Sequence, residues 1–536
     1  MRLLSFLIFY SLLIHVQAQS WKVYPYQPEG SLVAFPADEG YHPAEAVEWW
    51  YMNGTLTGET TGKSYSFMIS YFHVPMFGFD GFRIFNLADE TTGEFFTETL
   101  PCFYPVLSED HLQINAALYG GNAESWTTLT DNTGNLIPFE YALSAVSEAG
   151  NLELNLTNQK RPLLIADSGY CNQGGTSYSY YYSLTHLLAN GSITLNGVTE
   201  NVTGTTWMDH QYGNFNPSVA EQYEWLSIQL SNGMDFNIYN LFTAENTIPE
   251  NPDYRHMSVW VNDSTSFSAS DFLLERTQYI FMEDSMKCYA RQFHFVYDSI
   301  DLTFTTVHTN QEVLLPFRFY EGLMTVEGVA GNTTVGGSGF AELLHSYEHP
   351  RMRITHPQTG ATRGEQTTFS WQLLNPDEGR PVKYDIWISL MDSLNYNKMA
   401  QGIADTTWIW EHSGIEPGSP FFLVIEGYSI DTTLYGYAYS GQPLYVNADL
   451  KPFTDMIDEI SLYPVPADEY LLVRWKNKVT NTTINIYSLT GKLIFNQQAF
   501  TGDNLKLPVA SLEPGTYILT VENNRKISAE TFTIAR

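Results

Sequence analysis

The sequence predicts an all-β protein made of several barrels or sandwiches, and three observations support this prediction. Apolar and polar residues alternate in short segments, for instance at 65–72 and 302–307, which is the pattern of half-buried strands. Asn-Gly pairs at 53–54, 190–191 and 232–233 are typical of tight turns between strands. Long helical periodicity is hard to find after the N-terminal segment. Many short strands at regular spacing favour barrels and sandwiches.

The composition sets the size of the fold and excludes some functions. The chain has 536 residues, 43% of them hydrophobic and 15% aromatic, which excludes disorder and supports large cores. At roughly 100–200 residues per domain, this length predicts about three or four domains. With 26 basic and 59 acidic residues the net charge is −33. Such acidity argues against a nucleic-acid partner and against docking on anionic lipid, because both need a basic face.

The N-terminus has the pattern of an export signal. Arg2 precedes an apolar run at 3–16, and Ala18 provides a small residue at the expected cleavage point. The sequence therefore predicts a signal peptide at 1–18, since the run is shorter than the ~20 residues that span a membrane.

Three cysteines follow along the chain, Cys102, Cys171 and Cys288. Export permits a disulfide, but an odd number leaves at least one thiol unpaired within the chain. No CxxC spacing occurs, which argues against a thiolate metal site.

The first candidate site is the run Glu48-Trp49-Trp50-Tyr51, with His42 shortly before it. Trp49 and Tyr51 share one face of a strand and Trp50 lies on the other. Both faces must then be covered or line a cavity, because large aromatic side chains are costly to leave in water. Glu48 lies on the face of Trp50 and needs a partner or a raised pKa there.

The second candidate site is Trp207-Met208-Asp209-His210. Alternation places Trp207 and Asp209 on one face, and Met208 and His210 on the other. A carboxyl group against an apolar ring tends to stay protonated near neutral pH, which predicts an acid at Asp209. The alternative is that Asp209 and His210 have only a structural role at the end of a barrel.

The C-terminal part divides into two further domains. Pro350 ends a strand, and the strands around Trp371, Trp387, Trp408 and residues 422–424 predict a sandwich of the immunoglobulin or fibronectin type III kind at 351–449. We expect an accessory role for this domain.

The last domain, at 450–536, differs in charge, because residues 455–536 hold eight basic and nine acidic side chains. Its three blocks are Leu462-Tyr463-Pro464, Ile484-Asn485-Ile486-Tyr487-Ser488-Leu489-Thr490-Gly491 and Leu512-Glu513-Pro514-Gly515-Thr516-Tyr517. Their order resembles the C-terminal sorting domain of type IX secretion cargo in Bacteroidetes. The resemblance implies the type IX machinery as a partner and a secreted or outer-surface location.

The region before residue 350 also resembles a known family, the tandem-lipocalin family of carotenoid hydratases (CrtC) and AttH-like proteins. The blocks that carry the resemblance are Glu48-Trp49-Trp50-Tyr51 with Asn53-Gly54, Tyr180-Tyr181-Tyr182-Ser183, Trp207-Met208-Asp209-His210-Gln211-Tyr212-Gly213, Trp225-Leu226-Ser227-Ile228-Gln229-Leu230, Tyr320-Glu321-Gly322 and Gly337-Ser338-Gly339-Phe340-Ala341-Glu342. The resemblance implies two lipocalin-like β-barrels, at 19–205 and 206–350, with an apolar ligand pocket in or between them.

In this family an acid at the position of Asp209 is implicated in protonating an alkene. A Tyr commonly lies two residues before it, where this chain has Trp207, and Tyr180 and Tyr182 stand roughly where relatives have a His and a Trp. These departures weaken the case for carotenoid hydration itself but keep the acid.

The leading hypothesis is therefore an enzyme that acts by acid catalysis on an apolar alkene, through hydration, isomerisation or cyclisation. Asp209 would be the acid, and His210, Glu48 and His42 would orient it or manage the proton. The expected ligand-binding residues are Trp49, Trp50, Tyr51, Tyr180, Tyr182, Trp207, Trp225 and Gln229. The alternatives are a lipid or pigment carrier without turnover, which would use the same pocket, and a secreted hydrolase.

No cofactor or metal is expected from the motifs. Residues 345–349 match the H-x-x-E-H pattern of zinc peptidases, but that pattern needs a helix and this run continues a strand. No phosphate loop, Rossmann glycine pattern or G-x-S-x-G elbow occurs.

Overall fold

The computed structural model describes residues 20–215, 221–282, 286–358, 362, 365–390, 393, 395–446, 460–523 and 526–535. The predicted signal peptide at 1–18 lies outside this part. The chain divides into two compact units, Met1–Ser346 and Tyr347–Arg536. Both are built of strands, and the single helix among the described residues is a 3-10 turn, η1 (Ala37–Glu39), so the predicted all-β class is confirmed. No helix in the described ranges has the length and apolar character needed to cross a membrane.

The first sheet of unit 1 contains twelve strands. They are β1 (Val47–Gly58), β2 (Ser64–Met76), β3 (Phe79–Asp89), β4 (Glu94–Leu107), β5 (Gln113–Leu118), β6 (Ala123–Thr130), β7 (Leu136–Val146), β8 (Gly150–Asn158), β9 (Leu163–Leu164), β10 (Tyr170–Asn172), β11 (Tyr178–Leu195) and β12 (Val198–Asn214).

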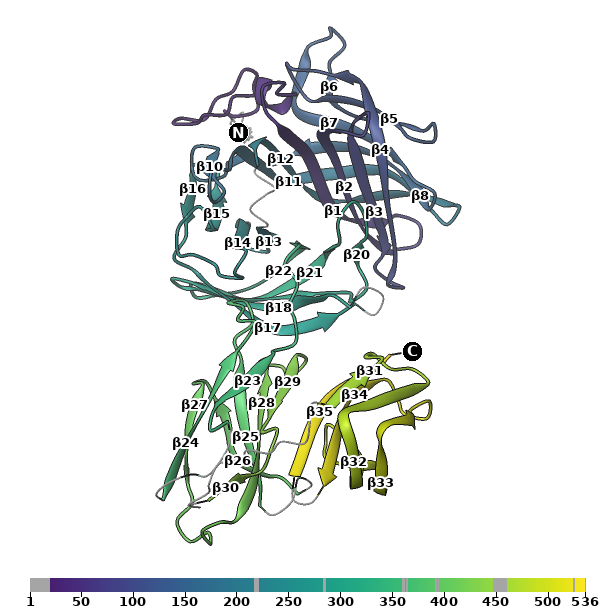
Figure 1. The fold of residues 1–536 in the computed structure, drawn as a ribbon. Coiled ribbons are helices and arrows are strands. Elements are labelled where there is room, and N and C mark those ends of the chain that lie inside the picture. The colour runs from purple at the N-terminus through teal and green to yellow at the C-terminus, as the bar shows by residue number, and fades with distance from the viewer. Residues whose placement is uncertain are drawn as a thin grey trace, which may run out of the picture. The chain divides into compact units, whose positions relative to one another are not determined.

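This first sheet closes on itself into a barrel, because β11 pairs with β12 on one edge and with β8 on the other (Figure 1). The inward side chains fill the barrel, with Trp50, Trp126, Leu184 and Met208 among the fully buried ones. The core is therefore packed with side chains, as is usual for small closed barrels.

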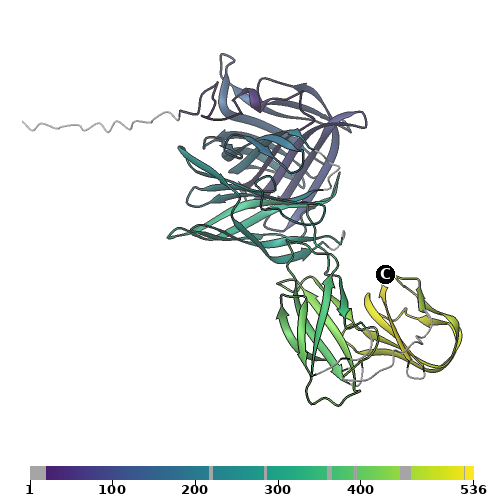
Figure 2. The same ribbon diagram turned by 60° about the vertical axis from the view of Figure 1, so that its left-hand side comes forward.

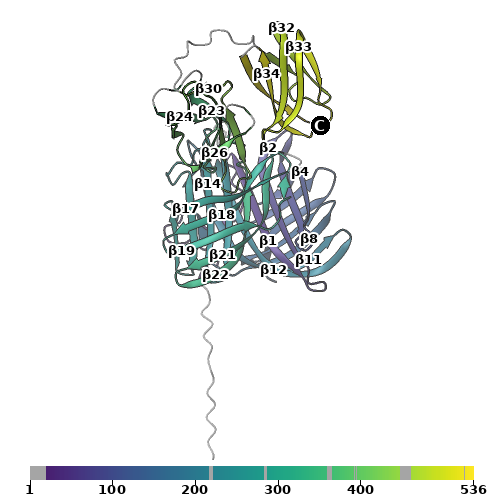
Figure 3. The same cartoon turned by 90° about the horizontal axis from the view of Figure 1, so that it is seen from below.

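The second sheet of unit 1 contains ten strands and stays open. Its path runs from β16 to β17, and no pairing joins these two end strands in the described part of the chain, so it forms a half-barrel (Figure 3). The strands are β13 (Gln222–Leu230), β14 (Asp235–Phe242), β15 (Arg255–Asn262), β16 (Thr265–Ala269), β17 (Leu273–Phe281), β18 (Cys288–Tyr297), β19 (Ile300–Thr306), β20 (Glu312–Val313), β21 (Phe319–Ala330) and β22 (Thr333–Leu343).

The chain passes from one sheet to the other later than the expected boundary at 205–206. That boundary falls inside β12, which pairs with β1 without interruption from Val202 to Gly213. The second sheet begins only at Gln222. Asp209 therefore belongs to a strand of the first barrel.

Two of the three Asn-Gly pairs are not turns. Asn53-Gly54 lies inside β1 and Asn190-Gly191 inside β11. A Cβ on Gly54 would come within 2.6 Å of Thr206 Cγ2, and one on Gly191 within 1.9 Å of the Glu153 carbonyl oxygen. These glycines thus permit close approach of neighbouring strands. Only Asn232-Gly233 forms the expected turn, where Gly233 has φ of +90°.

An aromatic layer separates the barrel from the second sheet. Its buried members come from both, with Tyr51, Trp207 and Tyr181 on the barrel side and Trp225 and Tyr239 on the other. Alternation explains this layer, because the neighbouring residues Trp50, Met208 and Tyr182 point into the barrel instead.

Unit 2 contains a two-layered sandwich and a small C-terminal β domain (Figure 2). The sandwich has one sheet of β23, β24 and β27 and another of β25, β26, β28, β29 and β30. Its strands are β23 (Met352–His356), β24 (Gln366–Leu373), β25 (Lys383–Leu390), β26 (Asn397–Ile403), β27 (Thr407–Glu411), β28 (Pro420–Tyr428), β29 (Tyr435–Tyr439) and β30 (Leu444–Tyr445). Phe369, Trp371 and Trp410 of the first sheet share a core with Ile386 and Leu423 of the second.

The C-terminal domain is one five-stranded sheet with its own core, in which Leu471, Ile486 and Leu519 are fully buried. Its strands are β31 (Ile460–Tyr463), β32 (Tyr470–Ser488), β33 (Leu493–Pro508), β34 (Gly515–Asn523) and β35 (Lys526–Ile534).

All three cysteines are buried, and none of them forms a disulfide with another. The disulfide that export would permit is therefore not formed among them.

Candidate active site

A cavity of about 520 Å³ lies in unit 1, where strands β1, β2, β3 and β12 of the barrel face β13, β14 and β22 of the second sheet. Its wall is mainly aromatic and aliphatic, and it includes three of the predicted ligand-binding residues, Trp49, Tyr51 and Trp225. Its other aromatic lining residues are Phe72, Tyr181, Phe215, Tyr223, Tyr239, Phe317 and Phe319. The pocket therefore lies between the two sheets and not inside the closed barrel.

Asp209 is the carboxyl group that the barrel contributes to this wall. The side chain is only 3% exposed and accepts three hydrogen bonds. Trp207 Nε1 and Ser183 Oγ each donate to Oδ1 at 2.6 Å, and Tyr181 Oη donates to Oδ2 at 2.5 Å. The strand register explains the set, because Ser183 is directly opposite Asp209 on β11 and Trp207 is two residues earlier on the same face.

A second set of hydrogen bonds fixes the Tyr181 hydroxyl. Its oxygen accepts from Trp225 Nε1 at 2.9 Å and from Asn237 Nδ2 at 2.7 Å. Both donors come from the second sheet, so the two sheets hold this hydroxyl together. With its oxygen taking two donors, the hydroxyl hydrogen is directed at Asp209.

Two opposing effects set the pKa of Asp209. Burial disfavours the charged form and raises the pKa from 3.8 to about 7, although the three hydrogen bonds from Ser183, Tyr181 and Trp207 favour the carboxylate and limit the rise. The raised pKa has the direction expected for Asp209, and its role as an acid stays a prediction. Trp207 acts in the opposite sense to its expected one, because its N–H stabilises the carboxylate.

The opposite wall holds carboxyl groups that the sequence analysis did not include in the site. Glu342 of β22 lines the cavity, and Glu321 of β21 lies directly opposite it in the register. Burial and the charge of Glu342 raise the pKa of Glu321 well above its ordinary value of 4.5. Tyr51 donates to Glu321 at 2.7 Å, and Tyr223 donates to Glu342. The charge of Glu342 also contributes to the raised pKa of Asp209.

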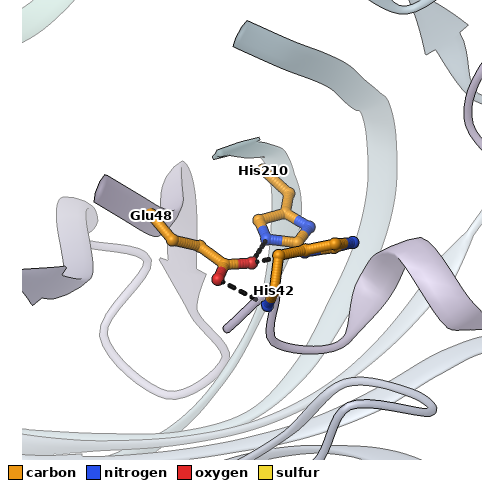
Figure 4. Close-up of side chains that lie close together, drawn as sticks. All are labelled: His42, Glu48 and His210. Carbon is orange, nitrogen blue, oxygen red and sulfur yellow. Dashed lines mark hydrogen bonds and ion pairs between the residues drawn. The ribbon is translucent and has the colours of Figure 1, made fainter. Parts of the chain in front are cut away.

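His210, Glu48 and His42 form a separate cluster on the other face of β12 (Figure 4). Glu48 Oε1 lies 2.8 Å from His210 Nε2 and 2.8 Å from His42 Nδ1. Both imidazoles also contact Asp38, His42 Nε2 at its Oδ1 (3.0 Å) and His210 Nδ1 at its backbone carbonyl (2.9 Å). These contacts lower the pKa of Glu48 despite its burial, and the two carboxylates raise the pKa of His42 to about 9.

This geometry corrects the expected role of His210, Glu48 and His42. Neighbours in a strand point to opposite faces, so Asp209 faces the cavity while His210 faces the barrel interior. The groups that orient Asp209 are Tyr181, Ser183 and Trp207 instead.

The remaining predicted ligand-binding residues also lie away from the cavity. Trp50 stacks on His210 with ring centroids 4.8 Å apart, and Tyr182 is fully buried against the same ring. Tyr180 stacks on Tyr212, and Gln229 donates to the Thr185 carbonyl oxygen at 2.5 Å. Trp207 lies behind Asp209 and acts as its hydrogen-bond donor.

The missed residues left a weak signal in the sequence. Tyr181 and Ser183 share a strand face, as do Tyr180 and Tyr182, but which face meets Asp209 depends on a register that the sequence does not display. Glu321 and Glu342 stand within apolar strand segments. A buried carboxylate in such a segment is itself a reason to suspect a site.

Comparisons with known proteins give two family matches and several structural similarities. The AttH-like family model matches residues 26–347, and the model of the secretion system C-terminal sorting domain matches residues 461–535. The structure of an AttH protein described from Nitrosomonas europaea is 20% identical with a TM-score of 0.49, and covers 60% of this chain and 98% of that chain. Kievitone hydratase from Nectria haematococca is 15% identical with a TM-score of 0.48, at the same coverages of 60% and 98%. No curated protein matches the sequence.

The sorting domain supports secretion or a cell-surface location through the type IX system. The matched AttH-like segment contains both sheets of unit 1 and more than half of the 536 residues. The chain therefore belongs to the AttH-like family and carries a C-terminal secretion sorting domain.

Proposed function

We propose that this protein is a secreted enzyme that binds an apolar, alkene-containing molecule in the cavity between its sheets and protonates it from Asp209. The observation that carries the proposal is a buried carboxyl group with a pKa of about 7 in the wall of an apolar cavity. Near neutral pH such a group is protonated for much of the time, and it can still lose its proton.

The proposed reaction begins with transfer of the Asp209 proton to one alkene carbon, which leaves a cation on the other. Trp49, Tyr51 and Trp225 line the cavity, and each aromatic face stabilises a cation by roughly 0.5–2 kcal/mol. In hydration, water then adds to the cation and loses a proton to the pair of carboxyl groups formed by Glu342 and Glu321. In isomerisation the cation loses a carbon-bound proton to the Asp209 carboxylate. In cyclisation a second alkene of the same molecule attacks the cation, and the new cation loses a carbon-bound proton to the same carboxylate.

The test is to incubate the chain from residue 19 onward with a lipid extract of the organism that makes it, in H2O and in D2O. Hydration adds the mass of one water, whereas isomerisation or cyclisation leaves the mass unchanged. In D2O, the acid step leaves one non-exchangeable deuterium on carbon. A lipid retained without change would support the carrier, and release of an acid from an ester would support the hydrolase.

Removal of one hydrogen bond is expected to move the pH profile. Trp207→Phe removes the N–H that stabilises the Asp209 carboxylate, so the pKa of Asp209 rises further. Because the protonated form is the active one, turnover of the wild type falls as pH rises through about 7. In the variant the fall occurs about one pH unit higher, as expected for the loss of a charged hydrogen bond.

The control for this shift is Trp126→Phe. Trp126 is fully buried inside the barrel, and its indole N–H has no hydrogen-bond partner. The Trp126→Phe substitution removes the same atoms from unit 1 but leaves Asp209 unchanged. The pH profile of turnover in this variant should therefore match that of the wild type. An unchanged profile in Trp207→Phe would contradict the assignment of Asp209 as the titrating acid.

A further inference from the structure

The second cluster, formed by His42, Glu48 and His210, joins three separate parts of unit 1. His42 follows η1, Glu48 begins β1, and His210 lies in β12. One ligand atom from each side chain lies within 4.8 Å of the other two, and Figure 4 shows the carboxylate of Glu48 between the two imidazoles. Glu48 and His210 are buried, whereas the side chain of His42 is 21% exposed.

The hydrogen-bond partners decide which nitrogen of each imidazole carries its hydrogen. His210 Nδ1 faces the Asp38 carbonyl oxygen, which only accepts, so this nitrogen bears the hydrogen. In the same way His42 Nε2 faces Asp38 Oδ1 and bears its hydrogen. When both imidazoles are neutral, the lone pairs of His210 Nε2 and His42 Nδ1 are both directed at Glu48 Oε1, 2.8 Å away.

Two lone pairs directed at a carboxylate oxygen require positive charge between them. Protons can supply this charge when both imidazoles are fully protonated. A metal ion supplies the charge with both imidazoles neutral. The contacts of His42 Nε2 and His210 Nδ1 with Asp38 fit a metal site. Metal-binding histidines almost always donate their other N–H to a carboxylate or a backbone carbonyl.

We propose that His42 Nδ1, His210 Nε2 and the carboxylate of Glu48 bind a divalent transition-metal ion of the zinc class. Two imidazole nitrogens and one carboxylate are an established zinc ligand set, with bonds of about 2.0–2.2 Å. The three ligand atoms lie within 4.8 Å of one another, close enough to surround one ion once the side chains adjust. The side chain of His42 is 21% exposed, so one side of the cluster reaches solvent.

The ion would fasten the segment that contains η1 and His42 to two strands of the barrel. It lies on the face of β12 opposite Asp209, so it is independent of the proposed acid catalysis. No metal was expected from the sequence motifs, and residues at positions 42, 48 and 210 show no spacing typical of a metal site.

The test is direct metal binding by the untagged full chain from residue 19 onward, after removal of metals with EDTA. We expect titration calorimetry with Zn2+ to give one equivalent with micromolar or tighter affinity. Co2+ in its place should give visible absorption bands of a low-coordinate site. The midpoint of thermal unfolding should rise with added Zn2+, because binding to the native state stabilises it.

Three variants and a control make the outcome decisive. Glu48→Gln and His42→Ala should each weaken Zn2+ binding by at least about 100-fold and abolish the rise in the melting midpoint, and Asp38→Asn should weaken it by about 10–100-fold. His42→Ala alters a partly exposed side chain, which keeps the test valid if Glu48→Gln does not fold.

The control is His294→Ala, since His294 contacts Glu275 and Asp301 at the surface and offers a comparable but exposed set of groups. It should bind Zn2+ like the wild type. Absence of Zn2+ binding by the wild type, or unchanged binding by a folded His42→Ala, would overturn the proposal. Neither result affects the test of Asp209, which follows lipid turnover.

Discussion

Asp209→Asn is expected to lower turnover by about 10²–10⁴-fold, the usual contribution of a general acid, while binding of the ligand in the cavity is largely retained. The amide has the shape of the carboxyl group and keeps an acceptor oxygen for Trp207 and Ser183. It has no proton of suitable acidity to transfer. The measurement is the rate of product formation by mass spectrometry, with retained lipid measured on the same samples.

A matched control is Asp235→Asn. Asp235 is also buried, and burial raises its pKa to about 6, but it is paired with Lys160 and does not line the cavity. Any loss of activity in this variant should follow its loss of folded protein, as measured by thermal unfolding. If Asp209→Asn keeps wild-type turnover, the acid lies elsewhere, and Glu342 on the opposite wall becomes the next candidate. If neither protein alters a lipid and both retain it, the carrier is favoured.

The faces of the site residues could be predicted from the sequence because the side-chain period of a strand is local. Trp49 and Tyr51 point away from Trp50, and Trp207 and Asp209 point away from His210, as alternation requires. Alternation also predicted that Glu48 needs a partner, and His42 and His210 provide it.

The partners of Asp209 could not be predicted, because they depend on pairings between distant strands. Ser183 meets Asp209 through the register of β11 on β12, and Asn237 reaches Tyr181 from the second sheet. The sequence analysis therefore grouped Asp209 with His210, its neighbour in the chain, although the sheet separates them. The turns predicted at two Asn-Gly pairs were wrong for a related reason. An Asn-Gly pair inside a strand, where the glycine permits close approach of a neighbouring strand, has the same sequence as one in a turn.

The same alternation gives β12 two chemical environments. One face presents an acid of raised pKa to an apolar cavity, and the other presents His210 to a cluster of charged groups. At Asp209, desolvation outweighs the hydrogen bonds and raises the pKa. At Glu48, the hydrogen bonds and charges of His210 and His42 together outweigh desolvation and lower the pKa. Because their surroundings differ in this way, two carboxyl groups of the same barrel can have different protonation states at one pH.

Arg83→Met is expected to destabilise the barrel by about 3–5 kcal/mol, the usual cost of removing one partner from a buried ion pair. The Arg83 side chain is fully buried in β3 and donates to Glu124 at 3.2 Å and to Glu98 at 2.7 Å. It also donates to the carbonyl oxygens of Glu98 and Val146. Methionine matches much of its volume but leaves Glu124 without a counter-charge.

The loss should grow with pH. Burial already raises the pKa of Glu124, and the charge of Arg83 lowers it, so the substitution raises this pKa further. The folded variant then holds a proton on Glu124 that the unfolded chain releases above about 4.5, and stability falls as pH rises beyond that value. The difference from the wild type should therefore be larger at pH 8 than at pH 5.

Because the chain has several domains, a single unfolding curve would mix their transitions. Pulsed hydrogen exchange along a urea gradient, read from peptides of β3 and β6, isolates the barrel. Lys63→Met is the matched control, since Lys63 pairs with Asp89 in the same barrel but is 43% exposed, and exposed pairs contribute about 0–1 kcal/mol. Adding Glu124→Gln to Arg83→Met removes the unpaired carboxylate and should recover most of the loss. An Arg83→Met barrel within about 1 kcal/mol of the wild type would mean that water, and not Arg83, solvates Glu124.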